Sequence, residues 1–572
     1  MTDQKAENLL NLALSVPEEE RKQTAELNVG FEQKDRTWEI IVKYNGDLRA
    51  VLETRFPKVR VHILTGGFAI LRVPQEQIEQ VISLKEIEYA EKPKRLYFAV
   101  DRARSASCLI PVQTGAEGLS GRGVLLGIVD SGIDYFHEDF RNADGSSRIL
   151  FLADQVSGNI YTKTEIDRAL RSGNREEAKK WIPSEDVGGH GTAVAGIAAG
   201  NGRESGGKYR GVAYESELAI VRLGIAGPYD FPRTTQLMEG VELIVRAASE
   251  LSMPLVLNIS FGNSYGSHDG NGLLERYLDS LSGVGKSVFV IGTGNEGASG
   301  GHASGRLQSG EAAEIELSIA PYETGFGLQI WKNYEDDLQI WISDPAMTEV
   351  REVSRRLGPQ RILLKNAMIL GYYGEPGPYN TAQEVYLEFL PVKQYIESGI
   401  WRIILKAGRV REGSYDLWLP SEAALNKSTR FLRPTPDTTL TIPSTAIRPI
   451  SVGAYDASTG TYAPFSGRGD TRLRRLPKPD LAAPGVGIMT TKSGGGYSPV
   501  TGTSFAAPMV TGAAALLMEW GIVRGNDPYL YSDKVKAYLR KGAKALPGFE
   551  AYPNPEVGWG ALCVSESLPS KI

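Results

Sequence analysis

Two separate stretches of the chain alternate uninterrupted apolar strands with helical segments. Strands are expected at 124–129, 218–223, 255–259, 287–291 and 447–452. Helices are expected over 235–251 and 504–518. Strands that are apolar throughout, without polar alternation, are typical of a parallel sheet that is covered by helices on both faces. We therefore predict an α/β fold, with a doubly wound parallel sheet built from two parts of the chain.

The glycine content marks the same division of the chain. Residues 105–305 and 441–572 contain 33 and 17 of the 64 glycines, whereas 1–104 and 306–440 contain 4 and 10. Dense glycine within apolar sequence indicates tight turns and close backbone contacts. We predict one domain formed by 105–305 and 441–572, preceded by a unit over 1–104 and interrupted by an insert over 306–440.

The other two units have patterns of their own. Residues 1–104 predict a small α+β domain of β-α-β-β-α-β type, with a hairpin around Gly66 and Gly67. Residues 306–440 contain short β-rich segments without intervening helices, which predicts an antiparallel sandwich. The expected strands of this insert are 314–319, 328–331, 338–342, 385–389 and 399–405.

Charge and hydropathy exclude several classes of protein. Lys and Arg number 63 and Asp and Glu 68, a net charge of −5, which gives no case for a nucleic-acid partner. Since no run approaches 18 apolar residues, we expect no membrane span. The apolar stretch at 9–16 has no basic segment before it, so we expect no Sec signal and synthesis in the cytoplasm.

Cysteine is nearly absent from the sequence. Cys108 and Cys563 are the only two, which excludes a disulfide framework and a zinc site made of cysteines alone. We expect both to be free buried thiols, in preference to a bridge or a nucleophile.

Three polar residues stand where an open parallel sheet forms its active site, outside the carboxyl ends of its strands. Asp130 follows the strand at 124–129, His190 begins a helix of small residues, and Ser504 begins the helix over 504–518. Singly, each could be an ordinary loop or helix cap. Their combination and their order, Asp, His, Ser, predict that the three side chains meet in one site.

A serine, a histidine and a carboxylate supply the groups for nucleophilic catalysis. A serine hydroxyl is a poor nucleophile until an imidazole takes its proton. The imidazole needs a carboxylate on its other nitrogen, which fixes its tautomer and stabilises the cation. This chemistry assigns Ser504 as the nucleophile, His190 as the general base and Asp130 as the orienting group.

Two further segments follow strands of the same sheet. Asn295 lies just after the strand at 287–291, where its amide can donate to an oxygen that becomes negative during acyl transfer. Ser260, Phe261 and Gly262 follow the strand at 255–259 and leave backbone groups that can pair with an extended peptide.

With these motifs the chain resembles the subtilisin-like serine proteases, or subtilases, over about 105–305 and 441–572. The resemblance implies a subtilisin-like fold, serine endopeptidase activity, and the roles given above for Asp130, His190, Ser504 and Asn295. It further implies a primary specificity pocket lined by Ser260, Phe261, Gly262, Gly292, Thr293 and Gly294.

Residues 1–104 resemble a subtilase propeptide, which in that family assists folding and inhibits the enzyme by threading its tail through the active site. This implies autoprocessing at a bond within 99–107. The closest resemblance is to the clostridial germination-specific, Csp-type subtilases. It implies a jelly-roll insert, a propeptide that stays bound in cis after cleavage, limited proteolysis of the proenzyme of a spore-cortex hydrolase, and an association with spores.

Two hypotheses on function remain open at this point. The first is an active endopeptidase that acts on a protein or peptide substrate such as a pro-hydrolase. The second is a self-cleaving subtilase that keeps its propeptide bound and acts as a regulatory or binding module. No metal ligands are predicted, because no Asp/Asn-rich loop with EF-hand spacing occurs in the sequence. Calcium is common in subtilases, so a calcium site assembled from separate loops stays open as an alternative.

Overall fold

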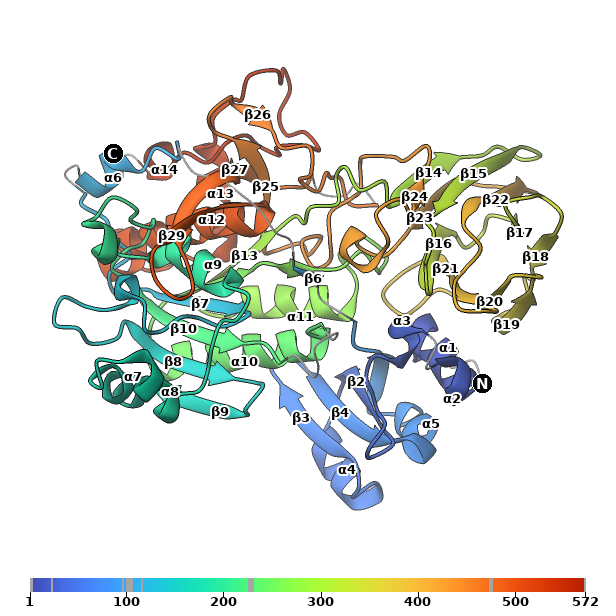
Figure 1. The fold of residues 1–572 in the computed structure, drawn as a ribbon, viewed down its shortest axis with the longest axis horizontal. Helices are drawn as coiled ribbons and strands as arrows, with labels where there is room; N and C mark the ends of the chain where they lie inside the picture. The colour runs from blue at the N-terminus through green and yellow to red at the C-terminus, as the bar shows by residue number, and fades with distance from the viewer. Residues whose placement is uncertain are drawn as a thin grey trace.

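The computed structural model describes residues 4–21, 24–94, 97–98, 106–114, 117–224, 231–472 and 477–569. Figure 1 shows an α/β domain on the left, an N-terminal domain in blue at the bottom, and a β-rich domain on the right. The N-terminal domain touches both of the others.

The α/β domain is built on a mostly parallel sheet with the strand order β26-β25-β13-β11-β7-β10-β8-β9, and β27 pairs with β25. All pairs from β25 to β8 along this order are parallel, as predicted. Strands β8 and β10 lie on one side of β7. Strands β11 and β13, which come later in the chain, lie on its other side, so the strand order reverses at β7. The strands are β7 (Leu125–Asp130), β8 (Ile149–Asp154), β9 (Asn159–Thr162), β10 (Glu217–Arg222), β11 (Leu255–Ile259), β13 (Ser287–Gly292), β25 (Ile450–Asp456), β26 (Thr461–Tyr462) and β27 (Leu481–Pro484).

Helices cover both faces of this sheet. Leu126 and Ile128 of β7 share a core with α9 and α12, whereas Leu125 and Val129 share another with α10 and α11. Alternate residues of one strand therefore face opposite helical layers, as expected for a doubly wound sheet. The main helices are α9 (His190–Ala199), α10 (Thr234–Glu250), α11 (Leu273–Ser282), α12 (Thr503–Met518) and α13 (Ser532–Lys541). Smaller elements of the domain are α6 (Ile110–Thr114), α7 (Lys163–Leu170), α8 (Arg175–Trp181), β12 (Phe261–Gly262), β28 (Val486–Thr491), β29 (Tyr497–Thr501) and α14 (Val564–Ser567).

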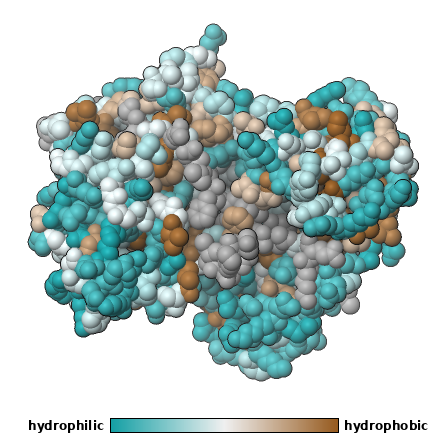
Figure 2. Space-filling model, viewed as in Figure 1, coloured by the Kyte–Doolittle hydropathy of each residue, from teal (hydrophilic) through white to brown (hydrophobic). Residues whose placement is uncertain are grey.

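In the part of the chain that the structure describes, one helical stretch, Thr503–Val523, is long and apolar enough to cross a membrane. Its most apolar window is 89% buried inside the structure, so it serves as the central core helix of the α/β domain. On the face drawn in Figure 2, hydrophilic residues cover the N-terminal domain and the region of α7 and α8, and hydrophobic residues occur in small scattered groups.

The N-terminal domain contains a sheet in which β2 pairs with β4 on one edge and with β1 and β5 on the other, and β3 extends it beyond β4. Ile40 and Val42 pack on the domain's own helices, whereas Ile41 and Phe68 pack on α10 and α11 of the α/β domain. The elements are α1 (Asn8–Ser15), α2 (Glu18–Arg21), α3 (Ala25–Asn28), β1 (Phe31–Glu32), β2 (Thr37–Tyr44), α4 (Leu48–Arg55), β3 (Arg60–Leu64), β4 (Phe68–Pro74), α5 (Ile78–Ile82), β5 (Ile87–Glu91) and β6 (Tyr97–Phe98).

The β-rich domain consists of two antiparallel sheets with the orders β14-β23-β16-β21-β20-β19 and β18-β17-β22-β15-β24. Side chains of both sheets, such as Phe389 and Trp401, fill one common core. The strands are β14 (His302–Arg306), β15 (Ala312–Ile319), β16 (Phe326–Asn333), β17 (Leu338–Ser343), β18 (Val350–Val353), β19 (Gly358–Leu363), β20 (Ala367–Tyr373), β21 (Ala382–Pro391), β22 (Gly399–Ala407), β23 (Ser414–Trp418) and β24 (Arg430–Phe431).

The apolar stretch at 9–16 forms most of α1, which the sequence pattern did not predict. Leu10 and Leu12 of α1 are buried in a cluster that includes Leu370 and Tyr372 of β20. The helix therefore lies against the sandwich, on the right of Figure 1.

The prediction of free thiols is wrong, because Cys108 and Cys563 form a disulfide with Cα atoms 4.9 Å apart. The segment before α6 meets the segment before α14, where Val564 N donates to Ser107 O at 3.0 Å. Folding brings together two residues that lie 455 positions apart, a proximity that no local pattern reveals.

Candidate active site

Asp130 and His190 are joined at the carboxyl edge of the parallel sheet. Asp130 is the last residue of β7 and is fully buried, and His190 is the first residue of α9. The Asp130 carboxylate accepts a hydrogen bond from His190 Nδ1 at 2.7 Å. This contact fixes the imidazole tautomer and leaves Nε2 as its basic nitrogen.

The turn before α9 is shaped around this contact. Gly189 precedes the helix with φ +73°, in the left-handed region that favours glycine. A Cβ on Gly191 would lie 2.1 Å from Gly132 O and 3.1 Å from Asp130 Cβ. The two glycines that flank His190 therefore let the helix start approach the end of β7.

Asp186 is a functional neighbour that sequence reasoning missed. Its carboxylate accepts hydrogen bonds from Gly189 N at 2.9 Å, Thr192 N at 2.7 Å and Ser131 Oγ at 2.7 Å. A carboxylate at a helix N-terminus satisfies free N–H groups and complements the helix dipole. Asp186 thus positions the start of α9. The sequence signal that could have indicated this role is an acidic residue just before a helix.

Ser504 is the second residue of α12, and Gly502, with φ +149°, precedes the helix. Its hydroxyl donates to Ser260 O at 3.3 Å, and Ser260 Oγ donates to Ser504 O at 3.0 Å. The ring of Phe505 lies 5.2 Å from that of His190 between centroids. The start of α12 therefore lies beside both the imidazole and the strand end at Ser260.

Asn295 is held by the same helix start. Its Oδ1 accepts hydrogen bonds from Thr503 N at 3.1 Å and from Thr503 Oγ1 at 3.2 Å. Because the oxygen is occupied by Thr503, the amide NH₂ is the end of the side chain that can donate to another group. Asn295 is therefore held against Thr503, the residue before Ser504.

The tail of the N-terminal domain reaches this site. Lys94 N donates to Thr234 Oγ1, and Thr234 N donates to Lys94 O, both at 2.8 Å. Three residues further on, β6 pairs antiparallel with β12, with Phe98 opposite Phe261 and Tyr97 opposite Gly262. An extended segment thus lies along the predicted peptide-binding strand. Most of the predicted processing region, 99–105, lies outside the described residues.

The residues predicted to line the pocket lie at the ends of two adjacent strands. Ser260, Phe261 and Gly262 continue from the end of β11, and Gly292, Thr293 and Gly294 continue from the end of the adjacent strand β13. The structure therefore places these six residues at the ends of strands in the sheet that also carries Asp130. Among the described residues, no group of three or more His, Cys, Asp or Glu side chains could hold a metal ion.

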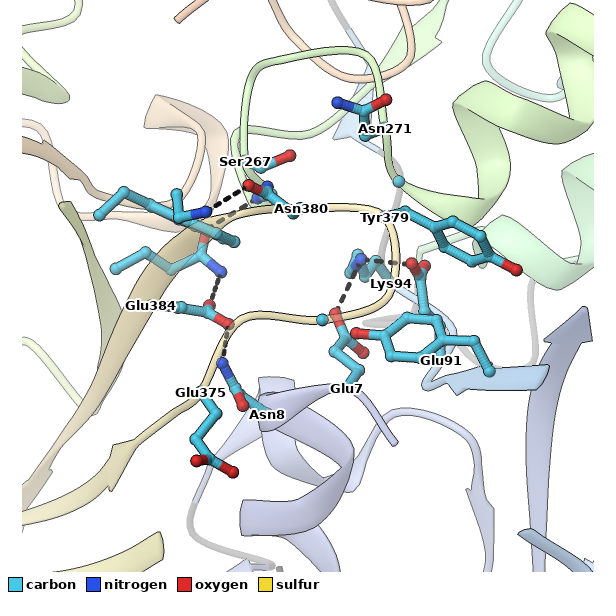
Figure 3. Close-up of a pocket in the computed structure, with 17 residues that line it drawn as sticks. Glu7, Asn8, Glu91, Lys94, Ser267, Asn271, Glu375, Tyr379, Asn380 and Glu384 are labelled. Carbon is cyan, nitrogen blue, oxygen red and sulfur yellow. Dashed lines mark hydrogen bonds and ion pairs between the residues drawn. The ribbon is translucent and has the colours of Figure 1, made fainter. Parts of the chain in front are cut away.

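A second polar cluster lies where the three domains meet (Figure 3). It lines a cavity of about 60 Å³. Lys94 Nζ contacts Glu7 Oε1 at 2.9 Å and Glu91 Oε2 at 3.4 Å. Glu91 Oε1 also accepts from Leu273 N of α11 at 2.9 Å. The buried ion pairs lie within the N-terminal domain, and the hydrogen bond from Leu273 N to Glu91 joins them to the α/β domain.

The β-rich domain contributes Glu384 to this cluster. Its carboxylate accepts from Asn8 Nδ2 of α1 at 3.0 Å and from the amide of Gln329. Burial and the nearby charge of Glu7 raise the pKa of Glu384 to about 7. Burial alone would lower the pKa of Lys94, but the carboxylates of Glu7 and Glu91 raise it above its ordinary value. Titratable side chains at this junction therefore contact residues of all three domains, and neighbouring charges change their pKa values.

The parallel sheet, with Asp130, His190, Ser504 and Asn295 at its carboxyl edge, is similar to that of the subtilisin-like serine endopeptidases. Residues 121–347 and 407–560 match the subtilase family, and residues 4–94 match the Csp protease B prodomain. The chain belongs to the subtilase family.

Solved and curated relatives agree with this assignment. The structure of the Clostridium perfringens CspB protease is similar with a TM-score of 0.75 and 38% identity, over 81% of this chain and 95% of that one. The minor extracellular protease Vpr of Bacillus subtilis (strain 168) is 24% identical over 79% of this chain. The C5a peptidase of Streptococcus pyogenes is 24% identical over 77% of it. The chain spans 52% of Vpr and 39% of the C5a peptidase, about half or less of their length.

Proposed function

We propose that this chain is a serine endopeptidase that uses Ser504, His190 and Asp130 as its triad and cleaves itself once, after the prodomain. The observation that carries this proposal is the antiparallel pairing of β6 with β12, beside Ser504. A protease substrate binds as an extended strand, and the chain's own tail lies in that manner.

The proposed reaction uses the groups of this site. Ser504 Oγ attacks the carbonyl carbon of the bound peptide and its proton passes to His190 Nε2, while the Asp130 carboxylate accepts the hydrogen bond from Nδ1. The amide of Asn295 donates to the oxygen that becomes negative. The C–N bond breaks as His190 returns the proton to the leaving amine. Water then hydrolyses the acyl-enzyme through the same groups.

Replacement of the nucleophile tests the proposal. Ser504→Ala should remain one full-length chain on a denaturing gel, whereas the native protein separates into two fragments near residue 100. Equal behaviour of the two proteins would refute autoprocessing. A thermal melt of Ser504→Ala provides the control for folding.

We further propose that the enzyme activates a proenzyme by limited proteolysis, with a role in spore germination and an association with spores. The similarity to the CspB protease and to the Csp prodomain supports this proposal. The antiparallel sandwich is proposed to be the jelly roll of that group, and calcium is not proposed as a cofactor. Incubation of the processed protein with a spore-cortex pro-hydrolase should yield one shortened product, and an unchanged pro-hydrolase would refute this role.

A second candidate is a regulatory module that keeps its prodomain after one cut. The hydrogen bonds of Lys94 with Thr234 and of Leu273 N with Glu91, which cross from the prodomain to the α/β domain, favour retention. A fluorophosphonate probe distinguishes the two functions. Labelling of Ser504 in the processed protein supports the peptidase, and a processed protein that resists labelling supports the module.

A further inference from the structure

A loop of the sandwich reaches the active site of the α/β domain. It contains the one-turn 3-10 helix η4 (Glu422–Ala424), which follows strand β23. Glu422 N donates to Glu296 Oε2 at 3.2 Å, and the hydroxyl oxygens of Ser421 and Ser264 lie 3.2 Å apart. Glu296 directly follows Asn295, and Ser264 lies two residues after β12. The loop is therefore attached beside both the oxyanion residue and the strand that pairs with β6.

The sandwich holds the other end of this loop in place. Asn426 N donates to Glu323 Oε2 at 3.1 Å, and Asn426 Nδ2 donates to Pro321 O at 3.3 Å. Glu323 is only 4% exposed, so its carboxylate is a fixed acceptor inside the sandwich. A loop that is held at both ends presents a preformed surface, which a ligand can bind without the cost of ordering it.

The tail of the N-terminal domain lies against this surface. Strand β6, which pairs with β12, is also close to η4, and Figure 1 shows it at the border between the α/β domain and the sandwich. An extended segment in this position therefore has β12 along one side and the loop of the sandwich as a second neighbour. A peptide substrate that binds in the same manner would contact η4.

The surface that η4 presents is acidic. Glu422 and Ala423 are exposed to solvent. Burial raises the pKa of Glu296 to about 7, and the negative charge of Glu422 acts in the same direction. The Glu422 carboxylate is therefore close enough to Glu296 for the two charges to repel each other. A positively charged side chain on a bound peptide would relieve this repulsion.

We propose that η4 forms part of the substrate-binding surface and that Glu422 selects peptides with a lysine or arginine beside it. This inference rests on the proposed peptidase function and adds the substrate class to it. Strand β6 precedes the predicted processing region, so the selected side chain belongs to the amino-terminal side of the cleaved bond. The sandwich thus contributes a specificity-determining residue that the α/β domain does not supply.

Charge reversal on both sides of this contact tests the proposal in the full-length chain. Lysine or glutamate is placed at each position of β6 in turn, because successive residues of a strand face opposite sides. The four variants are Tyr97→Lys, Tyr97→Glu, Phe98→Lys and Phe98→Glu. At one of the two positions, the lysine variant should process about 5-fold faster than the glutamate variant, the upper range for an exposed ion pair.

A second substitution at Glu422 should change this preference. Adding Glu422→Lys should reverse the ratio of the two rates, and adding Glu422→Gln should bring it close to one. Glu412→Lys is the matched control, since Glu412 is an exposed glutamate that precedes β23, at the opposite end of the strand from η4. That substitution should leave the ratio as it is in the native background.

The possible outcomes separate this inference from the peptidase function. Equal rates for lysine and glutamate at both positions, or a ratio that Glu422→Lys and Glu422→Gln leave unchanged, would overturn the role of Glu422 and leave the peptidase function intact. A native chain that is never cut would overturn both. Thermal melts identify the folded variants, and Glu422→Gln keeps the test valid if Glu422→Lys does not fold.

Discussion

The Asp130 carboxylate binds His190 Nδ1 at 2.7 Å although the two residues lie 60 positions apart on different elements. Asp130 also accepts from Ser131 N at 2.7 Å, so its Oδ1 is held by the backbone as well as by the ring. A fixed carboxylate of this kind orients the imidazole and stabilises its positive form.

Asp130→Asn should therefore slow autoprocessing about 10⁴-fold with little change in fold, because an amide can hold the wrong imidazole tautomer. The rate of fragment formation in a time course measures the effect. Asp134→Asn is the matched control, since Asp134 binds Arg175 at 2.6 Å and not the imidazole. Equal rates for the two variants would contradict the role of Asp130.

Asn295→Ala should slow autoprocessing about 10²- to 10³-fold, the usual cost of losing one oxyanion donor. Asn295→Asp is the informative comparison, because it keeps an oxygen for Thr503 N but removes the NH₂ group. If Asn295 only positions Thr503, the Asp variant will process at nearly the native rate. We expect both variants to be slow.

The main strands of the α/β sheet and the catalytic motifs were predictable from the sequence because each rests on a local signal. The strand that became β7 is apolar throughout, and Asp130 directly follows its last apolar residue. Features that depend on contacts between distant segments were not predictable. Helix α1 is buried by packing against β20. The side chain of Thr441 lies between Gly262 and Gly294, which are far from it in the sequence.

The disulfide between Cys108 and Cys563 should stabilise the protein by about 2–5 kcal/mol. A variant with both cysteines replaced by serine should unfold at lower denaturant concentration than the native protein. A reducing agent should lower the native midpoint to that of the variant and leave the variant unchanged. Labelling of two thiols by a maleimide in the denatured, unreduced native protein would contradict the bond.

Retention of the prodomain after processing should be stronger at pH 6 than at pH 8. Burial raises the pKa of Glu384 to about 7 from an ordinary value of 4.5, so the assembled form binds an extra proton between these values. Stability from this group is therefore present at low pH and is lost as the pH rises through this window. The urea concentration that separates the two fragments on size exclusion should be higher at pH 6.

Two glutamine substitutions isolate the contribution of Glu384 to this pH dependence. Glu384→Gln is neutral at every pH, so it should weaken the difference between pH 6 and pH 8 in fragment separation. Glu375→Gln removes a carboxylate that lines the same cavity and accepts from Gln4 Nε2 at 3.0 Å on the exposed side. That variant should keep the native pH dependence. An unchanged pH dependence in Glu384→Gln would show that other groups at the junction, such as Glu91 with Lys94, carry the proton.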